Sequence, residues 1–222
     1  MCGRFGLHHV WQTTSQFLYD QFLVELNEKT LTLPTYNVAP TNPVITLIHD
    51  GTRFRGGLTN WGFKMEGLRQ PMVNARSETI LEKTLFRQSL KTKRCLILAS
   101  GFYEWQRTTK PSNTFWFYDH DKPFLVFAGI YQSWIDEHQT KHVRSAMLTT
   151  AANDLMKPIH DRIPVMLNPD QYRHWVHPKT PVDELTFLYK PTNFPNLAHY
   201  QVSSYVNLVK HNDPQCIEAI KK

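Results

Sequence analysis

FLVFAGI, residues 124–130, is an apolar run of strand length, and four similar runs lie around it in the middle of the chain. These are CLILA (95–99), TFWFY (114–118), SAMLTT (145–150) and IPVML (163–167). Each is rich in β-branched or aromatic residues and is bounded by polar residues, proline or glycine, as strands are. Because strands and helices do not alternate regularly, the sequence predicts an α+β fold with a largely antiparallel, barrel-like β core.

Flanking helices are predicted on both sides of this core. Residues 14–26 place apolar side chains at helical spacing behind a Thr/Ser cap, and residues 78–90 and 169–176 also have helical patterns. Pro169 suits the first turn of the last helix. YNVAPTNP (36–43) is predicted to be a rigid, proline-punctuated loop that leads into the strand VITLI (44–48).

Length and composition set the class of protein. The 222 residues, with 41% apolar and 13% aromatic content, fit one packed domain spanning residues 1–222. No apolar run approaches the ~20 residues that a membrane-spanning helix needs, and the first residues lack the pattern of a secretory signal. We therefore expect a cytoplasmic protein without a membrane partner.

Three cysteines, Cys2, Cys95 and Cys216, are too few and too widely spaced for a disulfide framework or a zinc motif. A reducing compartment fits this pattern. The net charge of +6 favours polyanionic partners without naming one.

The first residues, MCGRFG, place Cys2 directly behind Met1. If Met1 is removed, Cys2 carries an α-amine with a usual pKa of ~7.7–8.0 and a thiol with a usual pKa of ~8.5 on neighbouring carbons. Such an aminothiol reacts with an aldehyde in two steps. The amine forms a Schiff base, and the thiolate then closes a thiazolidine ring. Cys2 is therefore a candidate nucleophile.

Polar side chains stand beside apolar strands in three further segments, VNARSE (73–78), GFYEW (101–105) and IHDRIPV (159–165), and each has two interpretations. Asn74 could cap or turn the chain. Glu104 could be exposed, or could be desolvated by its aromatic neighbours and transfer protons. His160 could be a core histidine or an acid–base group, and Arg76 and Arg162 could form surface ion pairs or bind an anion.

These segments together resemble a known family. MCGRF, YNVAP, WG at Trp61, VNAR, GFYEW, TTAAN after SAML, and IHDRIPV occur in the order and approximate spacing of the SOS-response-associated peptidase (SRAP) family, from Met1 to about Val206. The resemblance implies a DNA-repair protein that captures abasic sites in single-stranded DNA covalently. It also implies a nucleoid-associated location if the protein is bacterial.

The resemblance also implies roles for matching residues. Cys2, which becomes the N-terminal residue when Met1 is removed, would link to the C1′ aldehyde of the ring-opened sugar, with lyase-like or peptidase-like chemistry. Asn74 would hold the Cys2 end, Glu104 would handle protons at the amine, and His160 would act on the sugar during ring opening and crosslink release. Arg76 would neutralise flanking phosphates.

Three further residues are assigned to the DNA backbone by the same resemblance. Arg162 would act with Arg76 as a bidentate phosphate donor. Arg4 and Thr149 are weaker candidates for the same contacts.

Other functions remain open from the residues alone. Cys2 with a histidine and an acidic or amide residue could form a thiol peptidase that acts on its own first residue, although no oxyanion hole is evident. A non-catalytic protein that binds single-stranded DNA, with Cys2 incidental, is a third hypothesis. A metal site from Cys2, His8 and His9 lacks a fourth ligand of recognisable spacing. No metal or cofactor is therefore predicted.

Overall fold

Twelve strands and three α-helices make up the secondary structure of a computed structural model that describes residues 2–64, 67, 69–106, 108, 110–185 and 194–220. The α-helices are α1 (Trp11–Phe22), α2 (Thr84–Thr92) and α3 (Pro169–Val176), and the short 3₁₀ turns are η1 (Glu28–Thr30), η2 (Ser77–Thr79), η4 (Ser204–Asn207) and η5 (Pro214–Ile217). The strands are β1 (Arg4–Leu7), β2 (Thr35–Val38), β3 (Pro43–His49), β4 (Phe54–Trp61), β5 (Asn74–Arg76), β6 (Arg94–Ala99), β7 (Gly101–Gln106), β8 (Asn113–Asp119), β9 (Leu125–Ile135), β10 (Lys141–Ala151), β11 (Arg162–Pro164) and β12 (Leu197–Val202).

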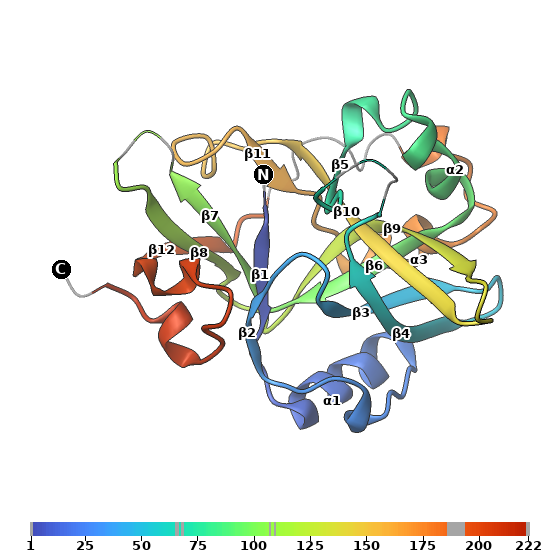
Figure 1. Ribbon diagram of the computed structural model, residues 1–222, viewed down its shortest axis with the longest axis horizontal. Coiled ribbons are helices and arrows are strands. Elements are labelled where there is room, and N and C mark those ends of the chain that lie inside the picture. The colour runs from blue at the N-terminus through green and yellow to red at the C-terminus, as the bar shows by residue number, and fades with distance from the viewer. Residues whose placement is uncertain are drawn as a thin grey trace.

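Five strands close into a barrel in the order β10-β4-β3-β6-β9, because β9 pairs again with β10. The β10–β4 pair is parallel and the other barrel pairs are antiparallel. Two short strands pair with the C-terminal part of β10, β5 in parallel with residues 147–149 and β11 antiparallel to residues 149–151. A second, antiparallel sheet has the order β12-β8-β7-β1-β2 and lies at the left of the barrel in Figure 1. The predicted α+β fold with a largely antiparallel, barrel-like core is confirmed.

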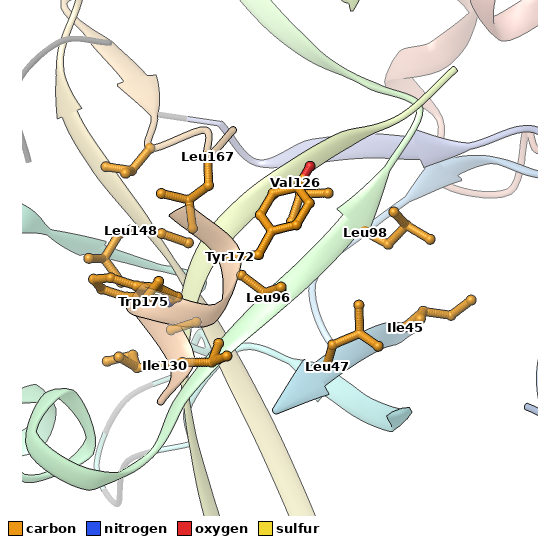
Figure 2. Close-up of a cluster of buried hydrophobic side chains, with 14 of the residues drawn as sticks. Ile45, Leu47, Leu96, Leu98, Val126, Ile130, Leu148, Leu167, Tyr172 and Trp175 are labelled. Atoms are coloured by element: carbon orange, nitrogen blue, oxygen red, sulfur yellow. The ribbon is translucent and has the colours of Figure 1, made fainter. Parts of the chain in front are cut away.

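Side chains alternate between the two faces of the barrel strands, as the two-residue period of a strand requires. One set faces the barrel interior, where Phe127 and Met147 are buried with Trp61. The other set faces outward, and Figure 2 shows Leu96 and Val126 in this outer layer beneath the side chains of α3. All three helices place buried side chains in the outer layer, so they are the flanking helices that the sequence predicts.

Helix α3 has the bounds that the sequence predicts, residues 169–176, with Pro169 in its first turn. Asn168 and Gln171 form a reciprocal capping box at its start. The indole of Trp175 is fully buried and donates a hydrogen bond to the Cys95 carbonyl at 2.9 Å. Burying an aromatic side chain of this kind stabilises the fold by ~2–3 kcal/mol.

The prediction for the first helix is wrong at both ends. The helix begins at Trp11 rather than Thr14, and the Thr14 hydroxyl bonds back to the Val10 carbonyl at 3.2 Å instead of capping. The helix ends at Phe22 because Leu23 adopts a left-handed conformation with φ 53°. The chain after Leu23 then turns to pack on β4.

Several other elements differ from the sequence prediction, including the strand predicted at 163–167, which is only the short β11 (Arg162–Pro164). Residues 78–90 form η2 and α2 with a turn between them, and the loop predicted at 36–43 begins with part of β2. Strand β4 was not predicted, because its sequence FRGGLTNW contains two glycines that weaken a strand pattern. Gly56 is required there: a Cβ would lie 2.5 Å from a methyl group of Val24, which packs against the strand. No helix in the described part of the chain is long and apolar enough to cross a membrane.

Candidate functional site

Cys2 lies just before β1 and is buried, with 1% of its surface exposed. Its carbonyl accepts a hydrogen bond from the Asn74 amide at 2.7 Å, and its thiol donates a weaker one to the Arg4 carbonyl at 3.4 Å. In Figure 1 the N-terminal end lies among β5, β7 and β11, which are distant in sequence. The backbone of Cys2 is therefore held from a second strand.

Asn74 is the first residue of β5, which pairs in parallel with β10 through Met147. This pairing fixes the side chain against the N-terminal segment. Its amide nitrogen is used by the Cys2 carbonyl, whereas its Oδ1 is buried and accepts no hydrogen bond from the described residues. The interpretation of Asn74 as a simple helix cap does not fit, because it lies at a strand start and bonds across the fold.

Glu104 is in β7, which pairs with β1, and only 2% of it is exposed. The interpretation as an exposed glutamate is therefore wrong. Burial raises the pKa of the Cys2 thiol well above its usual range, and the nearby Glu104 charge raises that pKa further. The thiol is consequently protonated at neutral pH and lies within electrostatic reach of a carboxylate.

His160 lies in the turn before β11, with 8% of its side chain exposed. Its Nε2 is 3.8 Å from Oε1 of Glu104. Its Nδ1 accepts a hydrogen bond from the Arg162 backbone N–H at 3.0 Å and is 2.8 Å from the Asp161 carboxylate. The imidazole is thus oriented by the chain beside it, with its other nitrogen toward Glu104.

The four residues Cys2, Asn74, Glu104 and His160 are brought together by these contacts. Asn74 bonds to Cys2, the charge of Glu104 acts on the Cys2 thiol, and Glu104 contacts His160. The arrangement combines a nucleophile, a hydrogen bond that positions it, and two groups able to move protons.

The cations near this site differ in their surroundings. Arg76 ends β5 and is exposed. Arg162 is largely buried and forms a bidentate ion pair with Glu78 at 2.7 and 2.8 Å, which lowers the pKa of the Glu78 carboxyl. Arg162 also donates to the Thr149 carbonyl at 2.7 Å, and the Thr149 side chain is fully buried.

Arg4 points to the other side of β1. Its guanidinium donates to Asn37 Oδ1 at 2.7 Å and to the backbone carbonyls of Val206 and Asn207 at 3.0 and 3.3 Å. Arg4 therefore ties the η4 turn to the second sheet, and burial lowers its pKa. Two residues beside the site, Glu78 and Asp161, were not singled out in the sequence, although both lie inside the segments VNARSE and IHDRIPV.

The histidines at positions 8 and 9 lie at the end of β1, away from these contacts. Their rings are 4.5 Å apart, and Nε2 of His9 bonds to the Pro123 carbonyl at 2.9 Å. Within the described ranges, no group of three or more His, Cys, Asp or Glu side chains is arranged to hold a metal ion.

Comparison with known proteins gives concordant matches along the chain. The profile described as SOS response associated peptidase (SRAP) matches residues 1–209. Abasic site processing protein YoqW of Bacillus subtilis is 38% identical over 237 residues, covering 99% of this chain and 100% of that protein. Abasic site processing protein HMCES of Xenopus tropicalis is 29% identical, covering 84% of this chain and 66% of that protein.

Solved structures agree in fold. A protein from Bacteroides thetaiotaomicron superimposes with a TM-score of 0.74 at 25% identity, covering 84% of this chain and 85% of that one. A protein from Bordetella bronchiseptica superimposes with a TM-score of 0.75 at 19% identity, covering 91% and 100%. With the family profile matching most of its length, this chain belongs to the SOS response associated peptidase family.

Proposed function

We propose that this protein captures abasic sites in single-stranded DNA through a thiazolidine linkage to Cys2. Two independent lines support the proposal. Relatives that match nearly the whole chain are named abasic site processing proteins. In addition, the Cys2 backbone is held by Asn74, with Glu104 and His160 beside it. The position of Cys2 in this cluster is the observation that carries the proposal.

The reaction begins with the α-amine of Cys2, which loss of Met1 exposes; Met1 itself lies outside the described residues. The amine adds to the C1′ aldehyde of the ring-opened abasic sugar and water leaves, giving a Schiff base. The Cys2 sulfur then bonds to the same carbon while the C=N double bond becomes a single bond. The thiol proton passes to a base and the nitrogen takes up one proton, so the ring closure involves no net gain or loss of protons. The ring that forms needs no oxidant or cofactor, and the second bond traps the first.

The surroundings of the thiol favour this order of steps. A thiol whose pKa is raised by burial is a poor nucleophile at rest, so the amine attacks first. The Glu104 carboxylate is near enough to influence the thiol and is the proposed acceptor of its proton during ring closure. A thiol peptidase would need a resting thiolate, and the buried thiol does not favour that function.

His160 is the proposed acid–base group for the sugar. Its Nε2 faces Glu104, so the two groups can exchange a proton as the sugar ring opens. By microscopic reversibility the same imidazole serves the release of the crosslink.

Arg76 is the proposed main phosphate contact, because it is exposed at the end of β5, next to Asn74 and Ala75 in the strand. Arg162 is proposed to lie beside the DNA path, where a phosphate would compete with Glu78 for its guanidinium. Thr149 beneath it and Arg4 on the other side of β1 are proposed to act through position, by fixing Arg162 and the N-terminal strand. Such a protein would work in the compartment that holds the DNA.

The proposal is tested by mixing the untagged protein with an oligonucleotide that carries one abasic site. A slowly migrating covalent species should appear on a denaturing gel with the unmodified protein. Cys216→Ser, which changes a buried cysteine in another cluster, should give the same species. Cys2→Ser should give none that survives denaturation, and an equal yield from Cys2→Ser would refute the proposal.

A further inference from the structure

A cavity lies at the end of the barrel away from Cys2. Strand β10 runs from the Cys2 site to this cavity. Met147 pairs with Asn74 of the site, whereas Val143 and Lys141 line the cavity together with residues of β3, β4 and β9. The cavity has a volume of about 270 Å³, and we call it the barrel-mouth pocket. Its inward-facing lining includes Ile48, Gly57, Tyr131, Ser133, Lys141 and Val143.

The pocket exists because several inward-facing positions on β3 and β4 at this end of the barrel carry small residues. A Cβ added to Gly57 would meet no atom within 4 Å, so this position leaves space inside the barrel. Thr46 and Thr59 have short side chains, and their hydroxyls already form hydrogen bonds. The Thr46 hydroxyl donates to the Gly57 carbonyl at 3.3 Å, and the Thr59 hydroxyl donates to the Ser145 hydroxyl at 2.7 Å. At the other end of the barrel interior, Phe127 and Trp61 fill the corresponding space.

The lining combines an apolar wall with a cationic rim. Ile48, Val143 and the ring of Tyr131 provide apolar surface in a partly buried wall. Lys141 is exposed at the rim, and Lys93 reaches Ser133 with its ammonium group at 3.4 Å.

Arg55 is the second cation that lines the pocket, and it is paired with Asp50 at 2.6 Å. Among the described residues, no aspartate or glutamate lines the pocket itself. Small pockets of this kind, in the mouths of barrels, bind ligands through apolar contact with a few polar groups that fix orientation.

We propose that the barrel-mouth pocket binds a small organic anion with a compact aromatic or branched body, such as an aryl phosphate or aryl carboxylate. The body would contact Tyr131 and Ile48, and the anionic group would lie between Lys141 and the Ser133 hydroxyl. The volume, near the lower end of known ligand sites at ~300 Å³, admits one ring and its charged group but not a nucleic-acid strand. This assignment does not depend on the reaction at Cys2.

Phenyl phosphate is a suitable probe, followed by its effect on backbone amide signals of the isotopically labelled full chain. Saturable shifts should be confined to β3, β4, β9 and β10 around the pocket. Benzyl alcohol, a neutral compound of similar size, and inorganic phosphate should each bind at least about tenfold more weakly, because each lacks one of the two interactions.

Two substitutions localise the binding. In Gly57→Leu the added side chain would extend into open space without backbone strain. This variant should abolish probe binding while its thermal transition remains cooperative. If leucine impairs folding, Gly57→Ala is the replacement variant, and it should weaken probe binding. Lys141→Gln should weaken binding roughly tenfold, the loss of about 1.4 kcal/mol of charge-assisted contact. Lys210→Gln, a matched change of an exposed lysine near the C-terminus, should not.

Three results would overturn the proposal. Shifts outside the pocket, or none, would remove the site. Unchanged affinity in both Gly57 variants would show that the probe does not enter the barrel. Displacement of phenyl phosphate by an intact single-stranded oligonucleotide at equal charge concentration would assign the surface to nucleic acid instead of a small anion.

Discussion

At the scale of single residues, the candidate site joins four segments that are far apart in sequence. The residue types could be predicted, because Cys2 behind Met1 has specific chemistry and the other three stand beside apolar strands. Their contacts could not. Whether Glu104 was exposed or buried depended on β7 pairing with β1, and the bond from Asn74 to the Cys2 carbonyl depended on where β5 joins the barrel. Both contacts join residues that are far apart in the sequence, so local patterns do not predict them.

Glu104→Gln and His160→Ala should retain the nucleophile but form the adduct more slowly, by the ~10²–10⁴-fold that a positioned acid or base contributes. His160→Ala should also slow release, because one imidazole serves both directions. Release is measured by forming the adduct, adding excess competing abasic DNA and following protein transfer to it. Transfer as fast in His160→Ala as in the unmodified protein would return His160 to a structural role.

His8 makes the stability of the fold depend on pH. Burial, and then the neighbouring His9, lower its pKa from 6.5 to about 4. As the pH falls below 6.5, the unfolded chain therefore gains a proton that the folded chain does not, and stability is lost down to about pH 4. The melting temperature of the unmodified protein should fall more over this range than that of His8→Gln. Parallel curves for the two proteins would contradict this role.

At the scale of secondary-structure elements, Arg94 links both later helices to the barrel. It begins β6, is only 3% exposed, and donates to carbonyls at two helix C-terminal ends. These are Leu90 of α2 at 2.8 Å and His177, just after α3, at 2.6 Å. A buried cation at a helix C-terminus also interacts favourably with the helix dipole.

Arg94→Met should therefore destabilise the fold by ~3 kcal/mol or more, because several buried carbonyls lose their donors at once. The matched change Arg87→Met, on the exposed face of α2, should stay within about 0.5 kcal/mol of the unmodified protein. Urea denaturation gives both values. A loss below about 1 kcal/mol in Arg94→Met would mean that water or relaxed side chains replace the guanidinium.

Elements with strong local patterns were the ones that the sequence predicted well. The residues of α3 carry a cap, a first-turn proline and an apolar face, and its bounds were correct. Strand β4 was missed because the reasons for its two glycines lie outside the strand. Gly56 is explained by Val24, which packs against it, and Gly57 by the open space beside it. The end of α1 was missed because the turn at Leu23 is set by packing on β4.

At the scale of the whole molecule, the sequence did not predict which strands pair to close the barrel. A largely antiparallel barrel could be predicted from strand content, but not that β10 would pair with β9, β4, β5 and β11. That one strand brings Asn74, Arg162 and Thr149 to one end of the barrel. Charge is also a property of the whole chain, and the net charge of +6 favours a polyanion.

DNA affinity should consequently fall as salt rises, through counterion release. Arg76→Gln should weaken binding to abasic and intact strands alike and reduce the salt slope by about one. Arg53→Gln removes the same charge at the β3–β4 turn and should leave both quantities nearly unchanged. Binding that stays flat with salt, or equal losses in the two variants, would show that Arg76 does not mark the DNA site.

Intact mass of the adduct, combined with a count of reactive thiols, tests the central claim most directly. The mass should equal the protein without Met1 plus the abasic oligonucleotide minus one water. Alkylation of the denatured adduct should modify two of the three cysteines, because the Cys2 sulfur is in the thiazolidine ring. An adduct that retains Met1, or one in which all three cysteines are alkylated, would contradict covalent capture by the Cys2 aminothiol.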